Sequence, residues 1–227
     1  MKMILCGGGG SAQNPEAYEI FAANVDKRKP VLYIRFAALP DDYNAPYGKF
    51  ATWMADLGIF STRLCNSPEV FSEFDLSEFG GIFCSGGNTF RLLKTLKDCG
   101  ADKKIREYLK NGGTYIGSSA GAIIGGYDIM PIIYMDPNAV LLEDTHGLDM
   151  MNGWSTIAHY GNSASEFRNE EWDRAVRLLA TRYDKLIALS EQSAIIIDEN
   201  GATVQGAPCK VFENGAERII EAGCRLC

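Results

Sequence analysis

Short runs of apolar residues alternate with longer stretches of helical spacing through the first half of the chain. The apolar runs predict strands over 3–6, 31–36, 59–64, 81–84 and 114–116. Helical spacing predicts helices over 15–25, 43–57, 86–96 and 102–110. Continuous apolar strands that alternate with helices are typical of a parallel sheet covered on both faces. The pattern therefore predicts a three-layer α/β fold with a mostly parallel sheet.

The pattern changes after residue 127. A polar, irregular stretch over 136–149 comes first. Beyond it the pattern predicts a strand, a helix and a further strand over 155–159, 166–181 and 186–189. Three short alternating runs then predict a C-terminal β-meander over 194–198, 202–204 and 210–213, with turns at Asn200-Gly201 and Asn214-Gly215. Because no repeat, low-complexity segment or linker interrupts this order, we expect a single α/β domain over 1–227.

The segment Gly-Ser-Ser-Ala-Gly at 117–121 has the form Gly-x-Ser-x-Gly. It lies between the predicted strand 114–116 and a small, apolar run at 122–124 that begins a helix. A nucleophile elbow needs this context, because its serine occupies a strained turn that leaves no room for flanking side chains. Glycines flank Ser119 but not Ser118, so Ser119 is the predicted nucleophile. The alternative is a strand–helix turn that needs small residues only for close packing.

Composition limits the classes of function. The 227 residues are 46% hydrophobic and 22% charged, which is ordinary for a globular protein, and the formal net charge is −7. This charge does not favour binding to nucleic acid or to a membrane surface. No apolar run approaches the roughly 18 residues that span a bilayer or forms a signal peptide. Seven irregularly spaced cysteines resemble reduced thiols, so we expect a cytoplasmic protein.

Two kinds of bound group are not expected. The glycine run at 7–10 follows the first strand, but a dinucleotide fingerprint needs a glycine where Ala12 stands and an acid where Ala37 stands. We interpret the run as a turn at the rim of the active site. The two histidines are distant in sequence and have no zinc-ligand motif beside them, so neither a cofactor nor a metal is predicted.

A serine nucleophile requires a general base, and histidine is the usual one. His159 ends the predicted strand 155–159, where a parallel sheet would place it beside the elbow. His146 lies in a polar loop and is the alternative. We therefore predict His159 as the base.

The base in turn requires a carboxylate that orients it. Glu191 follows the predicted strand 186–189 at its carboxyl end and is the predicted acid. Asp128, Asp136 and Asp144 lie between the serine and the base and compete with it. The sequence does not measure the distances that would decide among them.

An oxyanion hole requires two backbone N–H groups that face the tetrahedral oxygen. Ala120 supplies one in this interpretation, because it follows the nucleophile at the start of a helix. Gly87 or Asn88 supplies the other from the Gly-Gly-Asn-Thr turn at 86–89. That turn also has the residues of a helix N-cap, and the two roles are compatible.

These motifs resemble those of the peptidase E and cyanophycinase family of serine peptidases, which share the class I glutamine amidotransferase-like fold. The resemblance rests on Gly-Gly-Asn-Thr-Phe-x-Leu-Leu at 86–93, Tyr-Ile-Gly-x-Ser-Ala-Gly-Ala at 115–122, Met-Pro-Ile at 130–132, His-Tyr at 159–160 and the segment around Glu191. It implies Ser119 as nucleophile, His159 as base and Glu191 as acid. It also implies Gly87 and Ala120 as oxyanion donors.

Three positions depart from the family's pattern. Ser118 stands where peptidase E has a tryptophan, and Ile129 stands where peptidase E has an aspartate, which makes Asp128 the alternative acid. Arg168 is the nearest counterpart of the arginine that reads the acidic side chain of the substrate in peptidase E. We expect Arg168 and Asn88 to contact the substrate.

The resemblance implies a serine hydrolase that cleaves a small peptide or amide, such as an N-terminal aspartyl dipeptide, through an acyl-enzyme on Ser119. Arg168 or Arg91 would then hold the acidic side chain. A cyanophycinase-like enzyme that cleaves β-aspartyl-arginine units is one alternative, because a cationic substrate suits an acidic protein. A non-catalytic amidotransferase-like domain that binds a metabolite or partner is another. A glutamine amidotransferase is not expected, since a cysteine would occupy the elbow.

Overall fold

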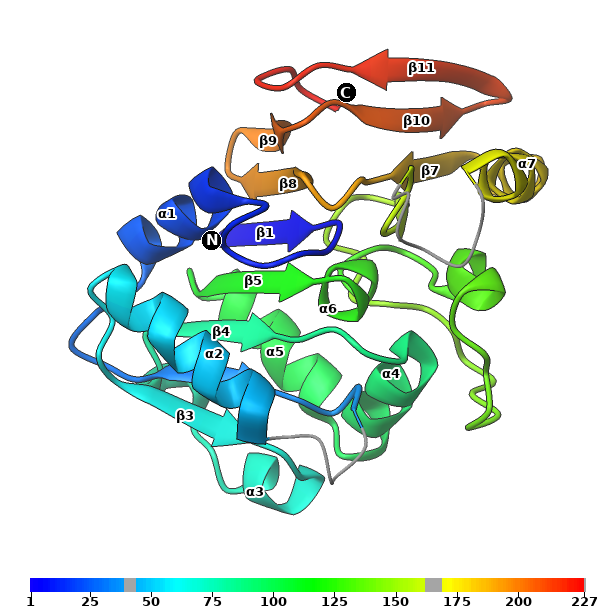
Figure 1. Cartoon of the computed structure of the whole chain (residues 1–227). Helices are drawn as coiled ribbons and strands as arrows, with labels where there is room; N and C mark the ends of the chain where they lie inside the picture. Colours follow the sequence, from blue (N-terminus) through cyan, green and yellow to red (C-terminus); the bar gives the residue numbers. More distant parts are fainter. Residues whose placement is uncertain (39–43, 162–168, 227) are drawn as a thin grey trace.

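A computed structural model describes residues 1–38, 44–161 and 169–226 of the chain. Its centre is a seven-stranded sheet with the spatial order β3-β2-β4-β5-β1-β8-β9 (Figure 1). The strands are β1 (Lys2–Cys6), β2 (Val31–Ile34), β3 (Thr62–Cys65), β4 (Gly81–Cys84), β5 (Thr114–Ser118), β8 (Ser193–Asp198) and β9 (Gly201–Gly206). The first five in that spatial order are parallel, whereas β8 and β9 form an antiparallel edge. The prediction of a mostly parallel sheet is confirmed.

A second sheet has the order β11-β10-β7-β6. Its strands are β6 (Ser155–Ile157), β7 (Lys185–Ala188), β10 (Cys209–Glu213) and β11 (Ala216–Ile220). β6 and β7 are parallel, and β10 and β11 pair antiparallel across a two-residue turn, Asn214-Gly215, in which both residues have positive φ. The C-terminal strands are thus antiparallel, as predicted, but they are divided between two sheets because β9 stays with β8 while β10 pairs with β7.

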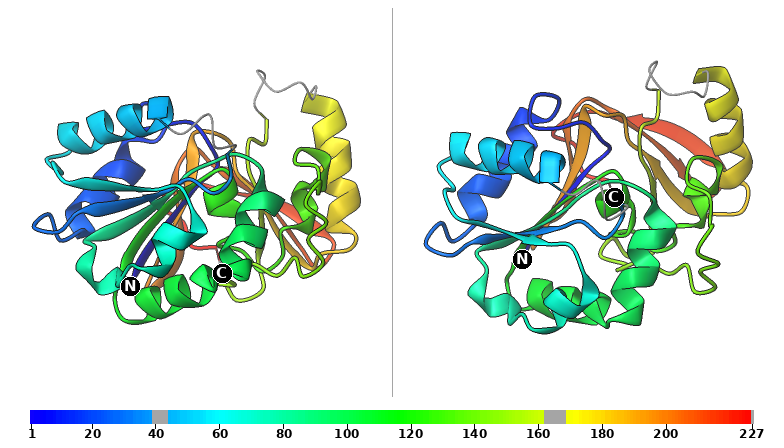
Figure 2. Two further views of the ribbon diagram at one scale, coloured as in Figure 1. Left: turned by 90° about the horizontal axis from the view of Figure 1, so that it is seen from below. Right: turned by 60° about the horizontal axis from the view of Figure 1, so that its bottom comes forward.

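Helices cover both faces of the central sheet (Figure 2). They are α1 (Pro15–Asn24), α2 (Asn44–Asp56), α3 (Pro68–Ser72), η2 (Leu76–Glu78), α4 (Thr89–Asp98), α5 (Ala101–Lys110), α6 (Ala120–Ile123), η3 (Met130–Tyr134) and α7 (Asn169–Ala180). The alternation of side chains along β1 shows how they are arranged. Ile4 and Cys6 pack in the core beneath α1 and α2, while Met3 and Leu5 pack in the core beneath α4 and α5. Both faces of the strand are therefore buried, which explains its continuous apolar run.

Several boundaries differ from the predicted ones. The predicted strand 155–159 ends at Ile157, and the helix after the elbow has only four residues. α3, η2, η3 and β11 were not predicted from the sequence. The predicted helices over 43–57 and 166–181 correspond to α2 and α7, although Tyr43 and residues 166–168 lie outside the described residues.

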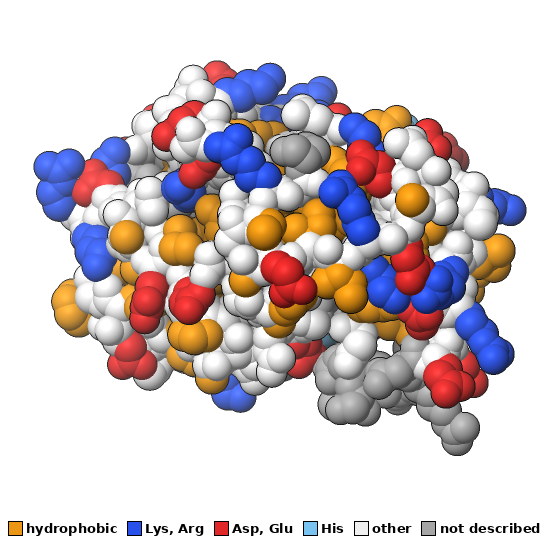
Figure 3. All heavy atoms as spheres, turned by 90° about the horizontal axis from the view of Figure 1, so that it is seen from above, with side chains coloured by type: hydrophobic (Ala, Val, Ile, Leu, Met, Phe, Trp, Pro, Cys, Tyr) orange, Lys and Arg blue, Asp and Glu red, His pale blue; other side chains and the backbone are white. Residues whose placement is uncertain are grey.

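The surface over β10 and β11 carries basic and acidic side chains interspersed with apolar ones (Figure 3). Among the described residues, the longest apolar stretches in helices fall short of what a bilayer crossing requires.

Candidate active site

The carboxyl ends of four parallel strands meet at one edge of the central sheet. β1 ends in the glycine run 7–10, β2 in Arg35, β4 in Ser85 and β5 in the elbow at Ser119. In open α/β sheets this edge is where ligands bind. The N–H of Ser119 donates to the carbonyl oxygen of Cys6 at 3.0 Å, which fixes the elbow against the end of β1.

The elbow backbone is strained at its central residue. Ser119 has φ 53° and ψ −115°, a region that residues with a side chain rarely adopt. A Cβ on Gly117 would lie 2.2 Å from the carbonyl oxygen of Gly121, and one on Gly121 would lie 2.1 Å from that of Cys84. Both flanking glycines are therefore required by the space around them.

His159 lies two residues beyond β6, in a turn rather than in the strand. Its φ is 57°, and its N–H donates to the carbonyl oxygen of Gly7 at 2.8 Å. The next N–H, that of Tyr160, donates to the carbonyl oxygen of Leu189 at 2.9 Å. These bonds hold the imidazole over the elbow, with Nε2 2.8 Å from Ser119 Oγ.

Glu191 reaches the other side of the same imidazole. Because β6 and β7 are parallel, the residues that follow them emerge at the same edge of the second sheet. Glu191 Oε1 lies 2.8 Å from His159 Nδ1, and the two side chains are 30% and 25% exposed. Ser119, His159 and Glu191 thus form a continuous hydrogen-bonded chain that is partly shielded from water.

Gly8 makes room for this chain. A Cβ on Gly8 would lie 2.5 Å from His159 Cε1 and 3.0 Å from Glu191 Cγ, and its φ is 148°. Asn14 Nδ2 donates to the carbonyl oxygens of both Gly8 and Glu191, at 3.0 and 2.5 Å. The glycine run therefore packs directly against the histidine and the glutamate.

The competing acids and the second histidine have other partners. Asp128 Oδ1 accepts from the N–H of Met130 at 2.8 Å, and Asp144 Oδ1 lies 2.8 Å from His146 Nδ1. Asp136 Oδ2 accepts from the N–H of Thr89 at 2.8 Å. Burial raises the pKa of Asp136, against the lowering effect of its hydrogen bonds with Thr89 and of the nearby His159.

The turn before α4 lies beside the serine. A Cβ on Gly86 would lie 3.1 Å from Ser119 Cβ, and one on Gly87, whose φ is 135°, would lie 2.6 Å from the carbonyl oxygen of Ala37. Arg35 Nη1 donates to the carbonyl oxygen of Gly86 at 3.2 Å. Since the C=O and N–H of a trans peptide point in opposite directions, the Gly87 N–H is turned away from Arg35.

Ala120, a predicted oxyanion donor, and Asn88, a predicted substrate contact, each lie at the start of a helix. Ala120 is the first residue of α6, where N–H groups have no carbonyl one turn earlier. Asn88 caps α4: its Oδ1 accepts from the N–H of Arg91 and its Nδ2 donates to the carbonyl oxygen of Pro137. Its contact with substrate stays a prediction. Arg168 lies outside the described residues.

A pocket of about 390 Å³ opens beside Ser119 and His159, between α2 and the ends of β2 and β4. Its lining includes Arg35 and Lys49, two cations that sequence reasoning did not place at the site. The position of Arg35 directly after a buried strand could have placed it at the site, but the predicted strand 31–36 included Arg35. Within the described ranges, no three His, Cys, Asp or Glu side chains form a group that could hold a metal ion.

Comparisons with known proteins agree with this architecture. The model of peptidase family S51 matches residues 3–205. Peptidase E of Escherichia coli is 30% identical in an alignment of 227 positions that covers 96% of this chain and 95% of that protein. A structure titled a putative peptidase E protein from Listeria monocytogenes EGD-e has a TM-score of 0.73 and 27% identity, and covers 90% of this chain and 98% of its own. A peptidase from an acI-B1 actinobacterium shares the fold, with a TM-score of 0.74, 21% identity, and coverage of 98% and 95%.

Proposed function

Because the chain belongs to peptidase family S51, and is therefore a serine-type peptidase, we propose that Ser119, His159 and Glu191 are its catalytic triad. The observation that carries this proposal is the pair of 2.8 Å contacts that join the three side chains through one imidazole. Peptidase families act on peptide bonds, and the substrate we propose is a small peptide.

The geometry supports acylation of the serine. Ser119 Oγ attacks the carbonyl carbon of the scissile bond while His159 Nε2 takes its proton. Glu191 accepts a hydrogen bond from Nδ1–H, which selects the tautomer with a free Nε2 lone pair and stabilises the imidazolium that forms. The N–H groups of Gly87 and Ala120 are the proposed donors to the tetrahedral oxyanion.

The intermediate then loses the amine. The imidazolium returns its proton to the leaving nitrogen, the C–N bond breaks, and an ester on Ser119 remains. A water molecule, deprotonated by His159, then attacks the ester carbonyl. The ester C–O bond breaks as the imidazolium returns the proton to Ser119 Oγ, which releases the acid and restores the free serine and the neutral imidazole. The same three side chains act in both halves of the reaction.

The proposed substrate class is an N-terminal aspartyl dipeptide, as the resemblance of the motifs of this chain to those of peptidase E implies. Relatives at 30% identity carry that name. A test is hydrolysis of α-aspartyl-leucine, with β-aspartyl-arginine as the competing substrate and the Ser119→Ala protein as control. We expect cleavage of the α-linked dipeptide that the variant lacks. Selective cleavage of β-aspartyl-arginine would favour a cyanophycinase-like enzyme, and a folded protein that cleaves neither would favour a binding domain.

The site also bears on domain organisation. Ser119 follows a strand of the central sheet, whereas His159 and Glu191 follow strands of the second sheet. We propose that residues 1–227 act as one domain, since neither sheet alone holds all three side chains.

The six cysteines described are free thiols, which supports a cytoplasmic location as part of the same proposal.

A further inference from the structure

The pocket of about 390 Å³ extends from the proposed nucleophile and base to the underside of α2. Ser119 and His159 line one end, and α2 contributes Lys49 and Trp53 to the other. The acyl group and the leaving amine of a substrate both lie beside the serine, but only the leaving amine must receive a proton from His159. A pocket that continues from His159 is therefore in reach of the leaving residue.

The walls of this pocket are aromatic. Tyr18, Tyr33, Trp53 and Phe83 line it. The rings of Tyr18 and Trp53 meet edge-on with centroids 6.0 Å apart, and those of Tyr33 and Phe83 stack at 5.3 Å. Such walls favour a bulky apolar or aromatic side chain over a small polar one.

The charge of the lining is positive. Arg35 and Lys49 contribute cations, and no Asp or Glu is among the described residues that line the pocket. Arg35 is also engaged with the carbonyl oxygen of Gly86, whereas Lys49 lies exposed on α2 at the pocket. In a chain of net charge −7, this local excess of positive charge favours an anionic group on the substrate.

The two halves of an aspartyl dipeptide differ in charge. The acyl residue carries an ammonium group beside its side-chain carboxylate, whereas the leaving residue carries a carboxylate and no ammonium group. A pocket that has two cations and no described acid suits the leaving residue better, because it would repel the ammonium group. We propose that this pocket is the subsite for the leaving residue, and that it selects a bulky apolar or aromatic residue with a free C-terminal carboxylate. In this assignment Lys49 binds the carboxylate, and Trp53 and the other rings bind the side chain.

This inference rests on the proposed function for its orientation, but its test does not need turnover. The ligands are L-phenylalanine, L-phenylalaninamide, which lacks the negative charge, and L-alanine, which lacks the ring. Their affinities for the Ser119→Ala protein are measured by isothermal titration calorimetry. We expect L-phenylalanine to bind about tenfold more tightly than either of the others, as for one charge-assisted hydrogen bond or one buried ring.

Variants assign the contacts. Lys49→Met in the Ser119→Ala background should weaken L-phenylalanine about tenfold and leave the amide unchanged. Lys103→Met, which alters an exposed lysine on α5, is the matched control and should change neither affinity. With Ser119 present, Lys49→Met should raise KM for aspartyl-phenylalanine with little change in kcat, because the lysine contacts the substrate in both ground and transition states.

Equal affinity for L-phenylalanine and its amide, or for L-phenylalanine and L-alanine, would overturn the assignment. So would an equal effect of the two lysine variants. If the ligand preferences are as expected but Ser119 of the original protein is never acylated, the subsite assignment stands and the proposed triad is contradicted instead. The two failures are thereby distinguished.

Discussion

At the scale of single residues, backbone contacts hold the three proposed catalytic side chains in place. The N–H groups of Ser119 and His159 donate to consecutive carbonyl oxygens at the end of β1, those of Cys6 and Gly7. Asn14 Nδ2 binds the carbonyl oxygen of Glu191. The end of β1 is thus a common anchor for residues that are distant in sequence, which is one way to hold reacting groups in a fixed geometry.

The first prediction concerns the acid. Glu191→Gln should lower kcat about a thousandfold with a small effect on KM, because the amide no longer stabilises the imidazolium or selects its tautomer. Asp128→Asn is the matched control and should change kcat less than about threefold. Steady-state kinetics on the best dipeptide measures both. A larger loss in Asp128→Asn than in Glu191→Gln would assign the acid to Asp128.

The second prediction concerns the space beside the base. Gly8→Ala should lower kcat at least about a hundredfold, because the added Cβ would lie 2.5 Å from His159 Cε1 and displace the imidazole. Gly48→Ala, at an open position of α2, should keep full activity and raise stability by about 1 kcal/mol. Equal activity of the two variants would show that His159 does not need its observed position.

At the scale of elements, the sequence predicted strands buried on both faces better than it predicted where they end. The apolar run that forms β2 continues through Phe36 and Ala37, which are buried outside the strand. It therefore concealed Arg35 inside a predicted strand. In the same way Ala158 is buried beyond the end of β6, so the predicted strand extended to His159, which lies in the turn that follows. At this edge of the sheets, residues remain buried beyond the ends of the strands, where the chain folds over the site.

The third prediction concerns the docking of α7. The Tyr160 hydroxyl donates to Asp173 on this helix, which also pairs with Arg177 at 2.8 Å and with Lys210 at 3.1 Å. Burial acts to raise the pKa of Asp173, but these bonds outweigh it and lower that pKa to about 2. Since the pKa is lower in the folded than in the unfolded chain, the stabilisation is full above the unfolded value and is lost as pH falls through the folded one.

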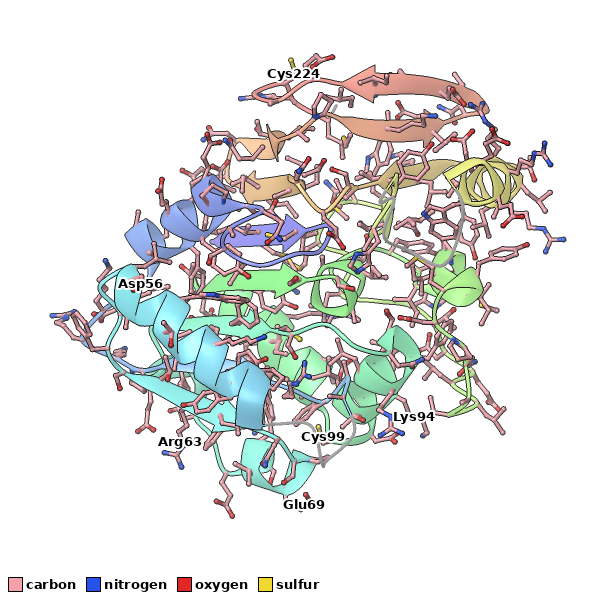
Figure 4. All side chains as sticks on the ribbon, in the orientation of Figure 1. Asp56, Arg63, Glu69, Lys94, Cys99 and Cys224 are labelled. Atoms are coloured by element: carbon pink, nitrogen blue, oxygen red, sulfur yellow. The ribbon has the colours of Figure 1, made fainter. Side chains whose placement is uncertain are left out.

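Asp173→Asn should therefore lower the free energy of unfolding by about 1 kcal/mol at pH 7, a value reduced for solvent screening. The difference from the original protein should shrink as pH falls from about 4 towards 2. Urea unfolding at several pH values measures it. Asp98→Asn is the control, because it removes an exposed pair with Lys94 within α4. Figure 4 labels Lys94 on that helix. A difference that does not vary with pH would contradict this origin of the stability.

At the scale of the whole molecule, the site joins two sheets. Of the proposed triad, Ser119 could be singled out from a local motif and His159 from a search among two histidines. The sequence could not predict that β6 and β7 belong to a second sheet, because pairing partners are set by contacts between distant segments. The pocket under α2 was missed for the same reason, since Tyr18, Lys49 and Phe83 come from three elements that only the fold brings together.

The fourth prediction concerns the thiols. Burial raises the pKa of Cys6 and of Cys84 to about 12, whereas Cys224 is exposed at the outer edge of the molecule (Figure 4). The thiolate is the reactive form, so iodoacetamide at pH 8 should alkylate Cys224 in the native protein and spare the two buried thiols. Peptide mapping by mass spectrometry measures this, with urea-unfolded protein as control. Rapid native alkylation of Cys6 or Cys84 would contradict the packing of the central sheet.

Intact-mass spectrometry after incubation with a fluorophosphonate measures whether Ser119 is an activated nucleophile. We expect one adduct on the original protein, none on Ser119→Ala, and slow formation on His159→Ala, because the base is needed to activate the hydroxyl. Circular dichroism of each sample establishes that the variants are folded. An adduct that persists in Ser119→Ala, or that forms at an unchanged rate without His159, would contradict the proposed triad.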